Sequence, residues 1–272
     1  MKSKTSWGPV AEWYDNLIEQ SPDSFQAKVI LPNLLRIIDP KKGMSIFDIA
    51  CGQGYFARAF HEKGAAVVGA DISKELIELA RKNSPADITY HVAAAEKLSN
   101  IVNAGPKHIS VRRDIYDIAL IVLAIQNIED MKAAFIEASK ILKPGGRFVL
   151  VINHPVFRIP GKTSWVWDEA GKAQYRRVDA YMSDSRTEID MNPGKTAKAA
   201  LDKAGTKTPQ NQTISFHRPL QSYFKALSAA GFSVTRLEEW ISHKQSQTGS
   251  RAAEEDRIRK EIPMFMCLEC GR

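Results

Sequence analysis

The sequence predicts an α/β protein built on a doubly wound, Rossmann-like sheet that is mostly parallel and carries helices on both faces. Nearly continuous Val, Ile and Leu without alternation is typical of strands that are buried on both faces. Each such run leads towards a helical pattern, and this alternation of strand and helix favours a parallel sheet. The runs are SIFDIA (45–50), AAVVGAD (65–71), YDIALIVLAI (116–125) and GRFVLVI (146–152).

The elements between and after these strands follow from local signals. Ser73 can cap a helix that ends near Lys82, before a weaker strand, ITYHVAA, at 88–94. The clearest helix covers 130–142, where apolar residues share one face and KPGG ends the pattern. A later helix ends at Gly231 and is followed by a strand. The final run, PMFMCLEC, is expected to join the sheet as an antiparallel last strand.

We expect residues 1–272 to form a single domain, with an N-terminal helical cap over 1–38 and an insertion over 156–215. The insertion leaves the sheet directly after a strand, at the edge where ligands bind in such folds, and this position predicts a substrate lid. Its second half is rich in Lys, Ala, Gly and Thr and is expected to be loose. Its first half offers aromatic residues that could cover the site: Trp165, Trp167, Tyr175 and Tyr181.

Composition narrows the function classes. The formal net charge is +7, but positive and negative residues alternate, so nucleic acid is not expected as a partner. No apolar run approaches the roughly 18 residues of a membrane span, so no membrane partner is expected either. Three cysteines cannot form a disulfide framework, which favours the cytoplasm. The two cysteines of CLEC would supply only half of the ligands of a zinc site, and no second Cys or His pair is nearby in the sequence, so no metal is expected. The oligomeric state cannot be derived from these residues.

The stretch FDIACGQGYFARAF (47–60) sets a buried strand against a glycine turn and a helix. Its spacing permits two ligands. Gly52, Gly54 and Ala57 fit the G-x-G-x-x-G/A pattern of a nicotinamide or flavin site. Asp48, Ala50, Gly52 and Gly54 fit a D-x-A-x-G-x-G turn.

Two acidic residues help to decide between these ligands. Asp71 ends the next strand, where its carboxylate could accept hydrogen bonds from both hydroxyl groups of a ribose. Dinucleotides and S-adenosylmethionine both contain that ribose. Asp48 lies two residues before the turn, where it would repel a pyrophosphate but not the amino end of a methionine moiety. The methionine cofactor therefore fits better.

Taken together, these motifs resemble those of the class I S-adenosylmethionine-dependent methyltransferases of the small-molecule type. The first motif is the glycine turn, VVGADIS resembles the ribose-binding segment, AAAEKL the adenine-side turn, and YDIALIVLAIQNIED with LKPGGRFVLVI the two following strands. The resemblance implies S-adenosylmethionine as the cofactor. The residues that it places around the cofactor are Tyr14, Asp48, Ala50, Cys51, Gly52, Gly54, Asp71, Ile72, Ala95, Glu96, Leu123 and Gln126.

In this resemblance, the residues of the turn hold the methionine part, Asp71 the ribose, Ile72 and the 95–96 pair the adenine, and Leu123 with Gln126 lie near the sulfonium. Tyr14 would close over the cofactor from an N-terminal helix. One departure is Ala94, because the family often has Asp there to bind the adenine amino group.

The resemblance implies transfer of a methyl group to an O, N or C atom of a small molecule. His154 begins HPVF at the exit of a strand, and it is either a catalytic base or a turn histidine before proline. An RNA-modifying methyltransferase and a non-catalytic S-adenosylmethionine-binding regulator stay open as alternatives. The absence of an NPPY-type tetrapeptide after the fourth strand argues against methylation of nucleic-acid bases.

Overall fold

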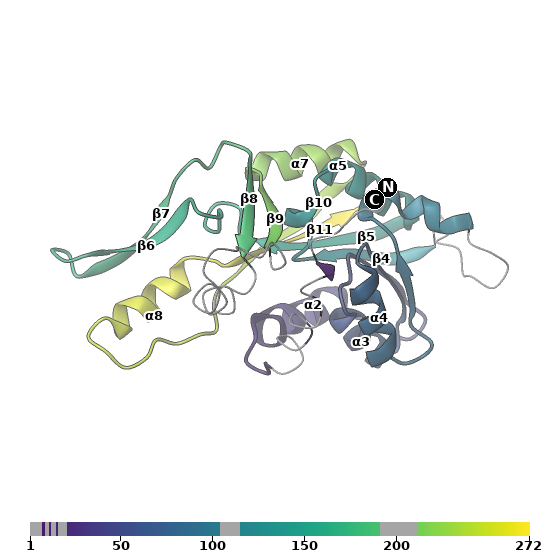
Figure 1. Cartoon of the computed structure of the whole chain (residues 1–272), viewed down its shortest axis with the longest axis horizontal. Helices are drawn as coiled ribbons and strands as arrows, with labels where there is room; N and C mark the ends of the chain where they lie inside the picture. The colour runs from purple at the N-terminus through teal and green to yellow at the C-terminus, as the bar shows by residue number, and fades with distance from the viewer. Residues whose placement is uncertain (1–6, 9–10, 12–14, 16–20, 104–114, 191–211) are drawn as a thin grey trace, which may run out of the picture.

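The computed structural model describes Trp7, Gly8, Ala11, Asp15 and residues 21–103, 115–190 and 212–272. Within this part of the chain, a seven-stranded sheet has the order β10-β11-β5-β4-β1-β2-β3 (Figure 1). The strands are β1 (Ser45–Ile49), β2 (Ala66–Asp71), β3 (Thr89–Val92), β4 (Tyr116–Val122), β5 (Leu142–Asn153), β10 (Ser233–Trp240) and β11 (Phe265–Gly271). The pairs from β5 to β3 are parallel, and β11 runs antiparallel to both of its neighbours. The predicted doubly wound sheet with an antiparallel last strand is confirmed.

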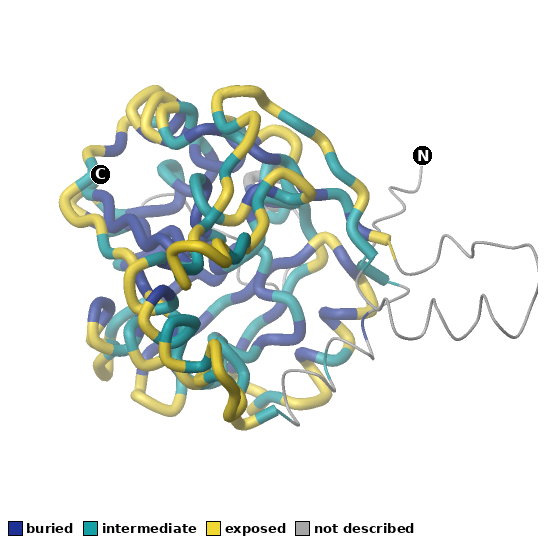
Figure 2. The backbone as a smooth tube through the Cα atoms, turned by 90° about the vertical axis from the view of Figure 1, so that its left-hand side faces the viewer, coloured by how far each residue is buried: buried dark blue, intermediate teal, exposed yellow. Residues whose placement is uncertain are grey.

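Helices cover both faces of this sheet. Helices α5 (Met131–Ile141) and α7 (Leu220–Ala229) lie on one face, and α2 (Leu31–Ile38), α3 (Tyr55–Glu62) and α4 (Lys74–Asn83) on the other (Figure 1). Successive strand residues alternate between these two layers. Figure 2 shows the resulting buried interior, with exposed stretches at the periphery.

The buried residues of β1 and β4 show this alternation. Phe47 and Ile121 pack in the core cluster that contains α5 and α7. Ile46 and Leu120 pack in the cluster that contains α2, α3 and α4. Because each strand contributes to both cores, its sequence is apolar throughout, which is the pattern that predicted it.

Ser73 caps its helix as predicted, Asp130 caps the next one, and two strand ends differ from the expectation. Ser73 Oγ accepts from Leu76 N at 3.2 Å, and Asp130 accepts from Ala133 N at 2.9 Å. The strand expected over 116–125 ends at Val122, because Leu123 takes a left-handed conformation with φ of 51°. Strand β5 begins before the KPGG turn rather than after it, since Leu142 already pairs with Tyr116.

The insertion is more regular than expected. Strands β6 (Thr163–Asp168) and β7 (Ala173–Val178) form an antiparallel hairpin, and β8 (Ser185–Asp190) pairs with β9 (Gln212–His217). The hairpin projects from the body beside α8 (Ala252–Glu261) (Figure 1). These strands were not predicted from the sequence, because each of them has polar residues on both faces. The half expected to be loose falls largely on 191–211, which lies outside the described residues.

The N-terminal part is described only in pieces. A π-helical turn, η2 (Gln26–Ile30), leads directly into α2. Tyr14 lies outside the described residues, so its predicted role over the cofactor stays a prediction. In the described ranges, the helices are too short or too polar for any of them to cross a lipid bilayer.

Candidate active site

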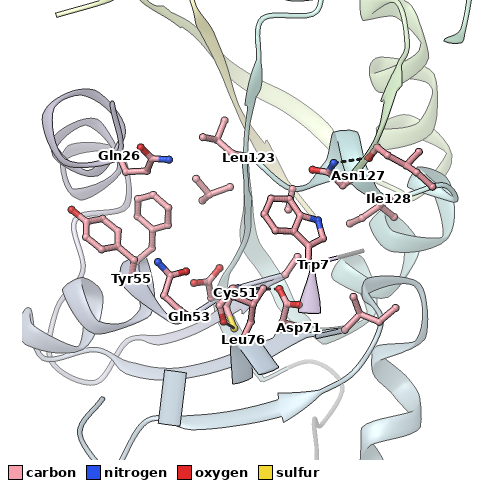
Figure 3. Close-up of a pocket in the computed structure, with 18 of the residues that line it drawn as sticks. Trp7, Gln26, Cys51, Gln53, Tyr55, Asp71, Leu76, Leu123, Asn127 and Ile128 are labelled. Atoms are coloured by element: carbon pink, nitrogen blue, oxygen red, sulfur yellow. Dashed lines mark hydrogen bonds between the residues drawn. The ribbon is translucent and has the colours of Figure 1, made fainter. Parts of the chain in front are cut away.

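A pocket of about 380 Å³ opens where β1, β2 and β4 end (Figure 3). This is the edge at which ligands bind in open α/β sheets. Among its lining residues are eight that the sequence predicted: Asp48, Ala50, Cys51, Gly52, Asp71, Ile72, Glu96 and Leu123. One pocket therefore gathers residues from four separate sequence motifs.

The glycine turn after β1 bends through three left-handed positions. Ala50, Gly52 and Gly54 have φ values of 58°, 56° and 82°. Gly adopts this conformation at little cost, whereas Ala does so with strain, and such strain is typical of functional turns. The turn is fixed by the Cys51 amide, which donates to Ala70 O on β2 at 3.0 Å.

Gly54 leaves room for a side chain of a neighbouring strand. A Cβ atom at this position would lie 2.4 Å from the Tyr90 hydroxyl oxygen, so the missing side chain makes room for Tyr90 of β3. Gly69 of β2 likewise leaves space for Cys51 and Tyr90. Gly54 supports the turn from behind and is not among the lining residues, so contact between Gly54 and a ligand stays a prediction.

Asp71 connects β2 to the glycine turn. Its Oδ2 accepts from Gly52 N at 3.0 Å and its Oδ1 from Ser73 N at 2.8 Å. Burial raises the pKa of Asp71, while these backbone donors oppose that shift. Each carboxylate oxygen has two lone pairs, so both can still accept a hydrogen bond from a ligand hydroxyl.

Asp48 is the most unusual group of the pocket. It is only 1% exposed, and its Oδ2 has no hydrogen-bond partner in the described part of the chain. Burial, and then the charge of Asp71, raise the pKa of Asp48 to about 8. A buried polar atom without a partner carries a free-energy cost that a ligand donor can relieve.

Gln53 is a second buried polar group without a partner. Its side chain is 2% exposed, and no described residue accepts from its Nε2. Gln53 lies between Tyr55 and Cys51 in the pocket, with Gln26 across from it (Figure 3). Gln53 was not predicted from the sequence, because the motif does not specify which residue stands between the two glycines of the turn.

The end of β4 forms the opposite side of the pocket. Leu123 lines it, and its carbonyl oxygen accepts from Gln126 Nε2 at 2.6 Å. Gln126 itself is not among the lining residues, and neither is Ala95, which is buried beside Glu96. Their predicted contacts with the cofactor stay predictions.

Other lining residues come from segments without a recognisable motif. Trp7 projects between Asp71 and Asn127, and Gln26 reaches the pocket from η2 (Figure 3). Ile214 and Phe216 come from β9. Only their position in the fold identifies them, because no local pattern marks them in the sequence.

His154 lies outside the lining of this pocket. It is 3% exposed, its Nε2 lies 2.7 Å from Glu239 Oε1 on β10, and its Nδ1 accepts from Val156 N at 3.3 Å. Burial lowers the pKa of His154, against the opposing effect of Glu239. Both ring nitrogens therefore have partners within the chain, and a role as catalytic base stays a prediction.

The four aromatic residues of the predicted lid also lie outside the lining. Trp165 is covered by Arg176, whose guanidinium lies 5.0 Å from the ring centroid, and Trp167 is covered by Arg251 at 4.6 Å. The Tyr181 hydroxyl accepts from Leu220 N at 2.9 Å, at the start of α7. A lid function of the insertion stays a prediction; among the described residues of 156–215, Ile214 on β9 lines the pocket.

The hydrogen-bond acceptors of the pocket fit S-adenosylmethionine. The buried Asp48 Oδ2 needs a hydrogen-bond donor, and the ammonium group of a methionine moiety is one. Asp71 faces the pocket at the end of β2, where a ribose would present its hydroxyl groups. Cys51 is no candidate nucleophile, because burial raises the pKa of its thiol well above the usual range.

Comparison with known proteins agrees with this geometry. Residues 47–150 match the family model of a methyltransferase domain. A crystal structure of an S-adenosylmethionine-dependent methyltransferase from Mesorhizobium loti is 26% identical, with a TM-score of 0.63, over 89% of this chain and 96% of that one. This similarity extends well beyond the residues of the family model.

Curated relatives match over a shorter stretch. The ubiquinone biosynthesis O-methyltransferase of Brucella ovis is 33% identical over 118 residues, which are 42% of this chain and 43% of that protein. The protein of the same name from Chelativorans sp. is 34% identical over 122 residues, or 43% of this chain and 44% of the relative. The matched stretch thus spans less than half the length of these relatives.

Proposed function

Because the chain belongs to the class I S-adenosylmethionine-dependent methyltransferases, we propose that it transfers a methyl group from this cofactor to an O, N or C atom of a small molecule. The observation that carries the proposal is the pairing of two buried carboxyl groups, Asp48 and Asp71, at the ends of adjacent parallel strands in one pocket. A pyrophosphate offers these carboxyl groups no hydrogen-bond donor, whereas an amino group and a ribose do.

When bound, S-adenosylmethionine supplies a methyl group on a positively charged sulfur, which leaves as a neutral thioether when a nucleophile attacks the methyl carbon. The residues of the chain have the task of orientation. Asp71 would accept from the ribose and Asp48 from the ammonium group, while Leu123 and Val122 line the same pocket. Holding the methyl donor and the acceptor in line can lower the barrier by roughly 7–11 kcal/mol. Some acceptors can therefore react without a strong base in the protein.

The protein keeps water away from this space with apolar side chains. Phe56, Leu123 and Ile128 line the pocket beside the polar residues. An acceptor with an O–H or N–H group loses its proton after or during attack, and solvent at the pocket mouth can take it. A cytoplasmic location, favoured by the cysteine content, completes the proposal.

The test is calorimetric titration of S-adenosylmethionine into wild type and Asp71→Ala. Loss of hydrogen bonds to a charged group predicts weakening by roughly 1–3 kcal/mol, about 5- to 150-fold in Kd. Asp87→Ala is the matched control, since Asp87 is exposed and paired with His61 away from the pocket. Binding of NADH, with no binding of S-adenosylmethionine, would contradict the proposal and restore a dinucleotide site.

A further inference from the structure

Strand β9 has an unusual distribution of side chains. Thr213, Ser215 and His217 are polar and buried, whereas the apolar Ile214 and Phe216 are only partly buried and line the pocket. The buried His217 Nε2 donates to Tyr181 O at 2.8 Å, and this hydrogen bond holds the polar face of β9 inside the protein. The apolar face is therefore open to the pocket, where a ligand can cover it.

This apolar face is held against the end of β4. Asn127 Nδ2 donates to Ile214 O at 2.6 Å, the dashed line in Figure 3. Arg218 donates from one NH2 group to Ile128 O at 2.9 Å and to Glu129 O at 2.6 Å. Three hydrogen bonds thus fix β9 as a wall of the pocket, opposite the glycine turn.

Among the described residues, the lining of the pocket has four acidic side chains, Asp48, Asp71, Glu96 and Glu129, and no lysine or arginine. Arg218 is not a lining residue; its guanidinium lies 5.0 Å from the centroid of the Phe216 ring and donates to the carbonyl oxygens named above. On β8, Arg186 pairs with Glu188 at 3.8 Å, outside the lining. An anionic acceptor would meet repulsion from the acidic side chains of the lining, and its desolvation adds a further cost.

We propose, on the basis of the methyltransferase function argued above, that the methyl acceptor is a largely apolar molecule without negative charge, bound against Ile214 and Phe216. Glu96 lies on the side of the pocket that the adenine would occupy, whereas Glu129 follows β4 on the β9 side. Glu129 is therefore available to an acceptor and favours a neutral hydroxyl or a cationic amine over a carboxylate. Phe216 and Ile214 set the shape that this acceptor must have.

The experiment uses three bicyclic probes of similar shape but different charge: 2-naphthol, 2-naphthylmethylamine and 2-naphthoate. Each is titrated into full-length protein saturated with S-adenosylhomocysteine, and binding is measured by ligand-observed NMR. We expect the alcohol and the amine to bind at least about tenfold more tightly than the carboxylate. Phe216→Ala should weaken the naphthol about fivefold or more while leaving the Kd of S-adenosylhomocysteine within about twofold.

Phe224→Ala is the matched control, because Phe224 is exposed on α7 and lies outside the pocket. Glu129→Gln should reduce the preference for the amine over the alcohol. Equal or tighter binding of the naphthoate overturns the inference, as does an equal loss of naphthol and S-adenosylhomocysteine in Phe216→Ala. Since cofactor binding is measured first in the same protein, failure of the cofactor to bind contradicts the proposed function instead.

Discussion

Asp48 is buried in a strand without a hydrogen-bond partner for its Oδ2 among the described residues, and its pKa is raised to about 8. The unfolded chain has the ordinary value near 3.8, so the folded state binds the extra proton between these two values. Its contribution to stability is therefore fully present below pH 3.8 and is lost as the pH rises through about 8. The side chain destabilises the ligand-free protein at neutral and alkaline pH.

This sign gives a prediction for Asp48→Asn. The variant should have nearly the same free energy of unfolding as wild type at pH 4, and should be more stable by several kcal/mol at pH 8, because the amide never ionises. The variant should also bind S-adenosylmethionine more weakly. Urea denaturation between pH 4 and pH 8, with calorimetric titration at pH 7.5, measures both effects.

Asp39→Asn is the control for this experiment, since Asp39 is exposed and pairs with Lys41 at 2.6 Å. Its stability should follow that of wild type across the same range. An Asp48→Asn variant that is less stable than wild type at pH 8 would contradict the buried, protonated carboxyl group.

At the residue scale, the sequence predicted side chains that belong to motifs and missed those that do not. Asp71 could be located because its spacing from the glycine turn follows from the geometry of a strand, a helix and a second strand. Gln26 and Phe216 reach the same pocket from segments far apart in the chain. Their approach depends on tertiary packing, which no local pattern encodes.

At the scale of elements, Tyr181 joins the start of β8 to α7. Its hydroxyl accepts from Leu220 N, one of the unpaired amides at a helix N-terminus, and its carbonyl accepts from His217. Removing the hydroxyl leaves that amide without its partner, so Tyr181→Phe should lower the free energy of unfolding by about 1 kcal/mol. Thermal and urea unfolding measure this change.

Tyr175→Phe provides the comparison, because Tyr175 is 50% exposed on the β6–β7 hairpin. It should leave the unfolding free energy unchanged within error. If both variants lose the same stability, the Tyr181 hydroxyl does not cap α7.

The strands of the sheet and the helices on it were predictable, whereas the hairpins were not. A strand that is buried on both faces must be apolar throughout, so its sequence is easy to recognise. Strands β6 and β7 form a two-stranded hairpin in which every residue is exposed or partly exposed, so it has no buried apolar face. Such a hairpin is stabilised by contacts like Arg176 over Trp165, which appear only in the folded chain.

At the scale of the whole molecule, the ion pair between Arg36 and Glu238 joins the first and last thirds of the chain. Glu238 on β10 accepts from Arg36 on α2 and from Trp240 Nε1 at 3.0 Å. Hydrogen bonding to Arg36 lowers the pKa of Glu238 to about 2, from its ordinary 4.5. The stabilisation is therefore fully present above pH 4.5 and is lost as the pH falls through about 2.

Glu238→Gln should lower the free energy of unfolding at pH 7 by about 1 kcal/mol or less, because Arg36 is half-exposed and the pair is screened. The difference from wild type should shrink as the pH falls from 5 to 3. Glu188→Gln, in an exposed pair on β8, is the control and should change little at any pH. A difference that stays constant with pH would mean that packing, not charge, is lost.

The acidic lining of the pocket also bears on how quickly the enzyme proposed here could begin a new cycle. The reactant carries a positive sulfur, while the product, S-adenosylhomocysteine, has a neutral one. Acidic side chains attract S-adenosylmethionine more strongly than S-adenosylhomocysteine, so the methyl transfer itself lowers the affinity of the pocket for the bound cofactor. Product release, which limits many enzymes, is thereby coupled to the chemistry. The same carboxyl groups that gather the reactant favour its replacement after each turnover.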